Sequence, residues 1–113
     1  MSTITNHEIS LQTAIDMTSR YRGKRPSNFP ICETFEKDVI QKLLNITGCA
    51  SFRIYYGMKA DEQVDAILVA VDAEGNDILP PSGNTAADTT DPVIIEDGYR
   101  CPDDCPPSSP LNS

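Results

Sequence analysis

The chain has few of the residues and motifs on which most enzymes depend. It contains one histidine, His7, in a polar segment where nothing indicates the third group that would position it for catalysis. The glycine-rich phosphate loop, the H-E-x-x-H motif, the G-x-S-x-G elbow and EF-hand spacing are missing. The sequence favours a non-catalytic protein without a cofactor. An enzyme using carboxylates from distant positions remains an alternative.

Long apolar runs are also missing. No segment approaches the ~20 consecutive apolar residues that cross a bilayer, and the longest run, residues 66–71, has the length of a strand. The N-terminal segment has neither a basic region nor an apolar stretch typical of a secretory signal. We therefore expect a cytoplasmic protein that makes no contact with a membrane.

Acidic residues are in excess and unevenly distributed. The net charge is −8, and it divides into +3 over residues 1–60 and −11 over residues 61–113. A negative charge opposes binding to nucleic acid phosphates, so no nucleic acid partner is expected. The basic patch between Arg20 and Arg25 has three interpretations. It complements the dipole of a helix end, binds an anion or an acidic partner, or contacts the acidic half of the chain.

Apolar residues at helical spacing predict two helices. The first begins after Ser10 as N-cap and stops at Gly23. The second starts at Pro30 or Thr34 and runs to Ile46.

The pattern then alternates with period two and predicts strands over 49–56, 63–71 and 77–79, with 93–95 as a candidate fourth strand. The predicted fold is α+β, with two helices packed on one face of a three- to four-stranded, mainly antiparallel sheet. We divide the chain into a flexible N-terminus (1–9), a core domain (10–80) and an acidic Pro/Ser-rich C-terminal tail (81–113). A core this small is marginal alone, which favours a homo-oligomer. The residues predicted to be buried are Phe35, Val39, Leu43, Phe52, Ile54, Leu68 and Val69.

Four cysteines are present, and in a reducing compartment they are expected to be free thiols. Cys101 and Cys105 have a C-x3-C spacing that also suits zinc, with Cys32 and Cys49 completing four ligands, or a redox pair. Plain structural thiols are the favoured interpretation, so no metal site is predicted. Because the C-x3-C pair follows the last predicted core element, we expect it to be dispensable for folding.

The tyrosine-rich strand offers a candidate interface. Arg53 and Tyr55 would lie on its outer face, and both residue types are enriched at binding hot spots. An ordinary solvent-facing role is an equal alternative.

Several segments resemble a family of short uncharacterised bacterial proteins: the R-I-Y-Y-G strand at residues 53–57 and the C-P-x-x-C-P-P-S-S-P-L-N tail at residues 101–112. The resemblance implies no activity, cofactor or site residue. We therefore expect a small non-catalytic binding or assembly module that self-associates. The alternative is a metal- or thiol-dependent accessory protein that uses the C-terminal cysteine pair.

Overall fold

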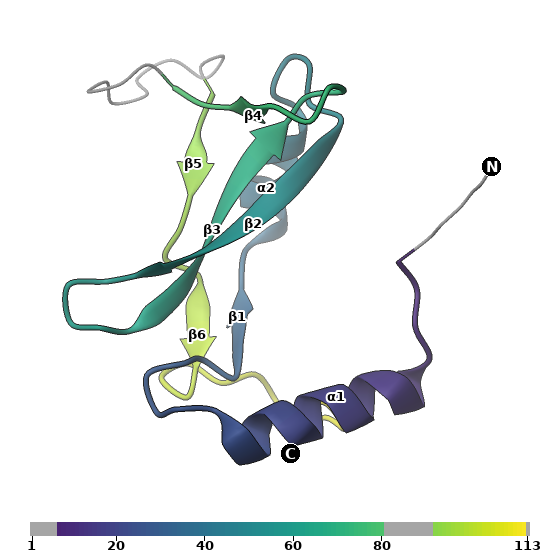
Figure 1. Cartoon of the computed structure of the whole chain (residues 1–113), viewed down its shortest axis with the longest axis vertical. Coiled ribbons are helices and arrows are strands. Elements are labelled where there is room, and N and C mark those ends of the chain that lie inside the picture. Colours follow the sequence, from purple (N-terminus) through teal and green to yellow (C-terminus); the bar gives the residue numbers. More distant parts are fainter. Residues whose placement is uncertain (1–6, 81–91, 113) are drawn as a thin grey trace. The chain divides into compact units, whose positions relative to one another are not determined.

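The computed structural model describes residues 7–80 and 92–112, which fall into two compact units (Figure 1). The first unit comprises Met1–Ser27 and Pro106–Ser113, and the second comprises Asn28–Cys105. The α+β class is confirmed, with two helices and mainly antiparallel strands. Among the described residues no helix is long and apolar enough to cross a membrane.

The first unit contains helix α1 (Leu11–Lys24). Its N-terminus is capped as predicted, because the Ser10 side chain accepts a hydrogen bond from the Thr13 backbone N–H at 3.0 Å. The predicted stop at Gly23 is wrong by one residue, since the helix runs through Gly23 and Arg25 is its C-cap. None of its residues is buried.

The second unit contains a two-stranded ribbon and a four-stranded sheet, all antiparallel. In the ribbon, β1 (Cys32–Thr34) pairs with β6 (Tyr99–Cys101). In the sheet, β3 (Val64–Val71) has β2 (Ser51–Met58) along one edge, and two short strands share its other edge. These are β4 (Asp77–Ile78) and β5 (Ile94–Ile95).

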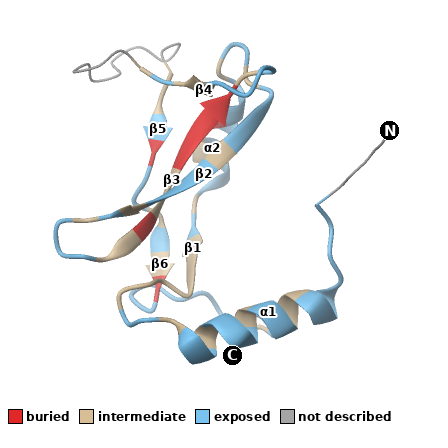
Figure 2. Cartoon of the chain, viewed as in Figure 1, coloured by how far each residue is buried: buried red, intermediate tan, exposed pale blue. Residues whose placement is uncertain are grey.

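The hydrophobic core lies between helix α2 (Lys37–Leu44) and β3 (Figure 2). Leu43 is fully buried and packs with Leu68, Ala70 and Ile95. Burying a leucine side chain contributes about 1.5–3 kcal/mol, so this cluster anchors the unit. The predicted burial of Leu43, Leu68 and Val69 is confirmed, and Phe35 and Val39 are partly buried against the core.

The main differences from the predictions lie at two places along the chain. The segment predicted to start the second helix contains β1, and α2 begins only at Lys37. The predicted tail contributes the candidate fourth strand as β5 and also contains β6, so the predicted boundary at residue 80 does not separate core from tail. The strands β1 and β6 were not predicted because they pair with each other across more than sixty residues, which no local pattern reveals.

Candidate functional site

The far edge of β3, opposite β2, is closed along its length. At one end, β4 pairs with Ala70 and Val71, and β5 pairs with Leu68 and Val69. Toward the other end, side chains and a loop take the place of a strand. The Ala66 N–H donates to Glu33 Oε2 at 2.9 Å, and the Val64 N–H donates to the Asn28 carbonyl at 2.9 Å. This edge is therefore satisfied within the chain.

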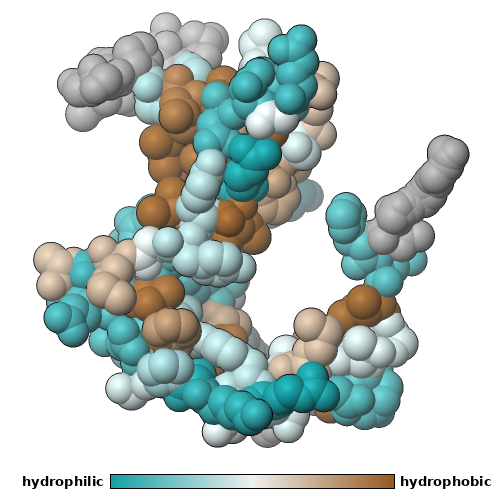
Figure 3. Space-filling view, in the orientation of Figure 1, coloured by the Kyte–Doolittle hydropathy of each residue, from teal (hydrophilic) through white to brown (hydrophobic). Residues whose placement is uncertain are grey.

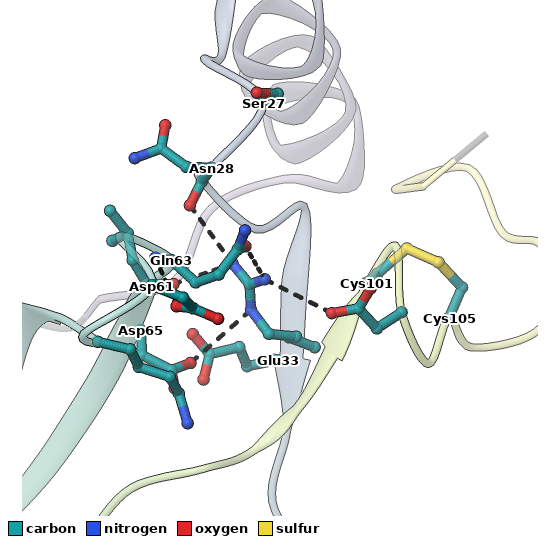
Figure 4. Close-up of polar contacts among 12 residues, drawn as sticks. Ser27, Asn28, Glu33, Asp61, Gln63, Asp65, Cys101 and Cys105 are labelled. Atoms are coloured by element: carbon teal, nitrogen blue, oxygen red, sulfur yellow. Dashed lines mark hydrogen bonds and ion pairs between the residues drawn. A yellow bond between two sulfur atoms is a disulfide. The ribbon is translucent and has the colours of Figure 1, made fainter.

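Arg100 on β6 completes this closure, and Figure 4 shows the polar residues around it, among them Gln63 and Asp65. Its Nη2 donates to the Val64 carbonyl at 3.0 Å, and its Nη1 donates to Gln63 Oε1. Its Nε lies 4.0 Å from Asp65 Oδ1. The planar guanidinium thus ties the ribbon to the start of β3 through several donors at once. In the sequence, Arg100 stands out only as the single positive charge of residues 61–113.

Three carboxylates, those of Asp65, Glu96 and Asp97, lie close enough to hold a metal ion, with ligand atoms within 4.8 Å of one another. The Lys59 ammonium contacts all three. Its Nζ is 3.3 Å from Asp65, 3.1 Å from Glu96 and 2.8 Å from Asp97. The lysine therefore supplies the positive charge that this cluster requires, and the arrangement is an internal ion-pair network.

Glu33, which is half-buried, and Asp65, which is buried, form a carboxyl pair. Within the described residues, no donor reaches Glu33 Oε1 or either oxygen of Asp65 with hydrogen-bond geometry. A proton on Glu33 would allow this group to donate a hydrogen bond to Asp65. Burial, followed by this hydrogen bond to Asp65, raises the pKa of Glu33 from 4.5 to about 7. Burial also acts to raise the pKa of Asp65, but hydrogen bonds and the Lys59 ammonium outweigh it and lower that pKa.

An open hollow of about 380 Å³ lies beside this network. Its lining includes Lys59, Gln63 and Arg100, but neither Glu33 nor Asp65. A general acid or base must come within hydrogen-bond reach of a substrate, and the shifted carboxyl pair does not line the hollow. The geometry therefore favours a structural role for the pair, which is to hold the ribbon against β3.

The outer edge of β2 contrasts with the closed edge of β3, because β2 pairs with β3 alone among the described strands. Lys59 and Gln63 form a hydrogen-bonded pair at the hairpin end, where the Lys59 N–H donates to the Gln63 carbonyl. Hydrogen-bonded and non-bonded pairs alternate along antiparallel strands. Counted from Lys59, every second residue of β2 therefore bonds to β3, and the residues between them do not. The N–H and C=O groups of Phe52, Ile54 and Tyr56 therefore point to the open edge.

The same strand also exposes apolar side chains, which we call the β2 stripe: Phe52, Ile54, Tyr56 and Met58. Their exposed fractions are 42%, 46%, 79% and 62%. The predicted burial of Phe52 and Ile54 is therefore wrong for the single chain. Phe52 and Ile54 lie opposite Ala70 and Leu68, two members of the core cluster. The stripe thus continues the face on which α2 packs, beyond the area that α2 covers.

The opposite face of β2 is occupied within the chain. Arg53 Nη1 lies 2.5 Å from Asp77 Oδ1, and the Tyr55 hydroxyl donates to Asp77 Oδ2 at 2.5 Å. Arg53 and Tyr55 were a candidate interface in the sequence, and in the structure both side chains bind Asp77 of the same chain.

Hydrophobic residues also remain at the surface over the sheet in the view of Figure 3.

The cysteines are arranged differently from the expected four free thiols. Cys101 and Cys105 form a disulfide, whereas Cys32 and Cys49 are free. Cys101 is buried in β6, so the pair does not follow the last core element, and the reason for expecting it to be dispensable is wrong. With two of the four sulfurs bonded to each other, the predicted zinc alternative lacks its ligand set.

The remaining candidate residues lie in the first unit. His7 is exposed. In the basic patch, Arg22 donates to the Leu111 carbonyl at 2.5 Å, and Arg25 donates to the carbonyls of Pro26 and Ser27. These contacts are to backbone carbonyls, and pairing of the patch with the acidic half stays a prediction.

No protein-family model, curated protein or solved structure matches the chain.

Proposed function

We propose that the protein is a small non-catalytic assembly module that self-associates through β2. The observation that carries the proposal is the β2 stripe, an apolar row at core periodicity that is 42–79% exposed in the single chain. The alternation predicts that Phe52 and Ile54 are buried, whereas the single chain leaves them 42% and 46% exposed. A second copy that covers the stripe accounts for both.

The open edge of β2 supports the same proposal. Exposed edge strands are usually short, carry lysine or proline, or are covered, since unpaired backbone groups recruit other strands. β4 and β5 have two residues each, and side chains cover the rest of that edge of β3. β2 has eight residues and contains no proline, lysine or acidic residue. Its edge therefore lacks the usual protection against pairing.

A second copy is the partner that fits this edge. Two β2 strands can pair antiparallel about a two-fold axis through Ile54, where the outward N–H and C=O groups of each copy meet. In this register Phe52 lies opposite Tyr56 of the other copy, and aromatic cross-strand pairs contribute about 0.2–1 kcal/mol each. Both copies then place α2 on the same face of one continuous sheet.

Charge does not oppose this contact, even though the chain carries −8. The one charged residue of β2 is Arg53, and it is neutralised by Asp77 of the same chain. Four acidic groups of the second unit pair instead with Lys59 or Arg100, namely those of Asp65, Glu96, Asp97 and Asp103. The surface that meets the second copy is therefore close to neutral, as is typical of the centre of an interface.

Sedimentation equilibrium tests the proposal. We expect wild-type protein at micromolar concentration to sediment at twice the 12.4 kDa of one chain. Ile54→Lys places a charge in the middle of the stripe and should shift the protein to monomer. Ile94→Lys is the matched control, because Ile94 has the same side chain and a similar exposure (48% against 46%) but lies on β5. A wild-type monomer, or equal effects of both variants, would refute the proposal.

A thiol-dependent accessory role is the second candidate, and the Cys101–Cys105 disulfide is the observation that favours it. The cytoplasmic location and the bacterial family remain predictions from the sequence. Neither is needed for assembly through β2.

A further inference from the structure

Three of the four cysteines come together in the β1–β6 ribbon. Cys32 is the direct register partner of Cys101, and Cys101 is bonded to Cys105. Cys32 is a free thiol of intermediate exposure. A free thiol therefore lies across the ribbon from an existing disulfide, although the spacing in the sequence singles out only Cys101 and Cys105.

The neighbouring pair shows which way these side chains point. Glu33 is opposite Arg100, and both of their side chains reach Asp65 on β3. Side chains alternate between the two faces of a strand. Cys32 and Cys101 therefore both project from the other face of the ribbon.

The expected Cα separation suits a bond between the two sulfurs, and the Cβ atoms must come closer together. Directly opposed residues on one face of an antiparallel pair have Cα atoms about 4.5–5.5 Å apart, which lies inside the range seen in disulfides. Their Cβ atoms are about 4.5–5.5 Å apart, which begins at the upper limit of the disulfide range of about 3.5–4.5 Å. Bond formation between Cys32 Sγ and Cys101 Sγ therefore requires the ribbon to adjust by up to about 1 Å.

We propose that Cys32, Cys101 and Cys105 form an intramolecular thiol–disulfide exchange site. Cys32 loses its proton to solvent, and its thiolate forms a bond to Cys101 Sγ. The Cys101–Cys105 bond breaks, its electron pair leaves with Cys105 Sγ, and Cys105 takes up a proton. One disulfide and one thiol are present before and after the step, so it requires neither an oxidant nor a reductant.

The two isomers differ in what they constrain and what they expose. The Cys101–Cys105 bond closes a short loop at the end of the second unit. The Cys32–Cys101 bond would instead fasten β1 to β6, beside the residues that close the edge of β3. It would also leave Cys105, which is exposed, as a free thiol able to form a mixed disulfide with a second thiol-bearing molecule. Cys49 precedes β2 and takes no part.

Peptide mapping distinguishes the isomers in the full-length oxidised protein. Trypsin cleaves after Lys37 and Arg100, so a Cys32–Cys101 bond joins two peptides, whereas a Cys101–Cys105 bond lies within one. We expect the joined pair, together with alkylated Cys105, to accumulate during incubation at pH 8 with iodoacetamide. Accumulation should slow as the pH is lowered, because the thiolate is the attacking form.

Variants provide the controls. Cys49→Ser should leave the exchange unchanged, and Cys32→Ser should abolish alkylation of Cys105. Cys105→Ser removes the leaving thiol, so mild oxidation of the folded variant should give the Cys32–Cys101 bond. Wild-type protein in which Cys105 is never alkylated and the two peptides are never joined would overturn the proposal. So would alkylation of Cys105 that persists in Cys32→Ser. Neither result depends on whether the protein self-associates.

Discussion

Replacing Glu33 by glutamine should remove most of the pH dependence of stability between pH 5 and 8. The pKa of Glu33 rises from 4.5 to about 7 on folding, chiefly through burial. Unfolded chains release this proton near pH 4.5 and folded chains near pH 7. The stability that this proton contributes to the folded state is therefore complete below pH 4.5, and it is lost as the pH rises toward 7.

The magnitude follows from the shift. One pKa unit corresponds to about 1.4 kcal/mol, so wild-type protein should lose about 2–3 kcal/mol of stability across this range, allowing for partial exposure. Glu33→Gln keeps an oxygen for the Ala66 N–H and adds an N–H₂ donor toward Asp65, which mimics the protonated acid. The variant should match wild type at pH 5 and exceed it at pH 8.

Urea denaturation of both proteins at half-unit pH steps measures this difference. Glu74→Gln, at an exposed glutamate in the turn between β3 and β4, is the control and should follow wild type throughout. A parallel pH dependence for Glu33→Gln and wild type would refute the account of the carboxyl pair. A variant that is less stable than wild type at pH 8 would refute it as well.

Four further substitutions test other parts of the second unit and of α1. Leu43→Ala should cost about 2–5 kcal/mol in urea denaturation, because Leu43 is fully buried; a near-neutral result would contradict the assigned core. Lys59→Met leaves three clustered carboxylates without their ammonium, so its melting temperature should fall more at pH 8 than at pH 5; an equal fall would contradict the network. Gly98→Ala should destabilise by about 1–3 kcal/mol, since its Cβ would meet the Phe35 ring at 2.8 Å. Gly23→Ala, in open space near the end of α1, should be neutral or stabilising, and a similar loss there would undermine the steric argument.

Local patterns predicted the central elements well. The alternation over 49–56 and 63–71 gave β2 and β3 nearly to their ends, and Ser10 gave the start of α1. The β1–β6 ribbon was missed because each strand has only three residues and its partner is distant in sequence. Short strands of this kind are defined by pairing, and their own residue pattern carries little information.

The candidate site was harder still to predict from the sequence, because its residues are also distant from one another along the chain. Glu33, Arg100 and Lys59 look like ordinary surface charges in the sequence, and only the fold brings them to Asp65. One signal was available: Asp65 interrupts an otherwise apolar strand, and a buried acid needs partners. The β2 stripe was identified correctly as apolar, but periodicity cannot tell whether the same chain or a second copy covers it.

Amide hydrogen exchange of β2 is the most direct test of assembly through this strand. The N–H groups of Phe52, Ile54 and Tyr56 point away from β3, whereas that of Arg53 points toward it. In concentrated protein the account predicts slow exchange at all four positions. On dilution below the dissociation constant, exchange should become fast at Phe52, Ile54 and Tyr56 while Arg53 stays protected. Fast exchange at the three outward positions at every concentration would contradict the central claim.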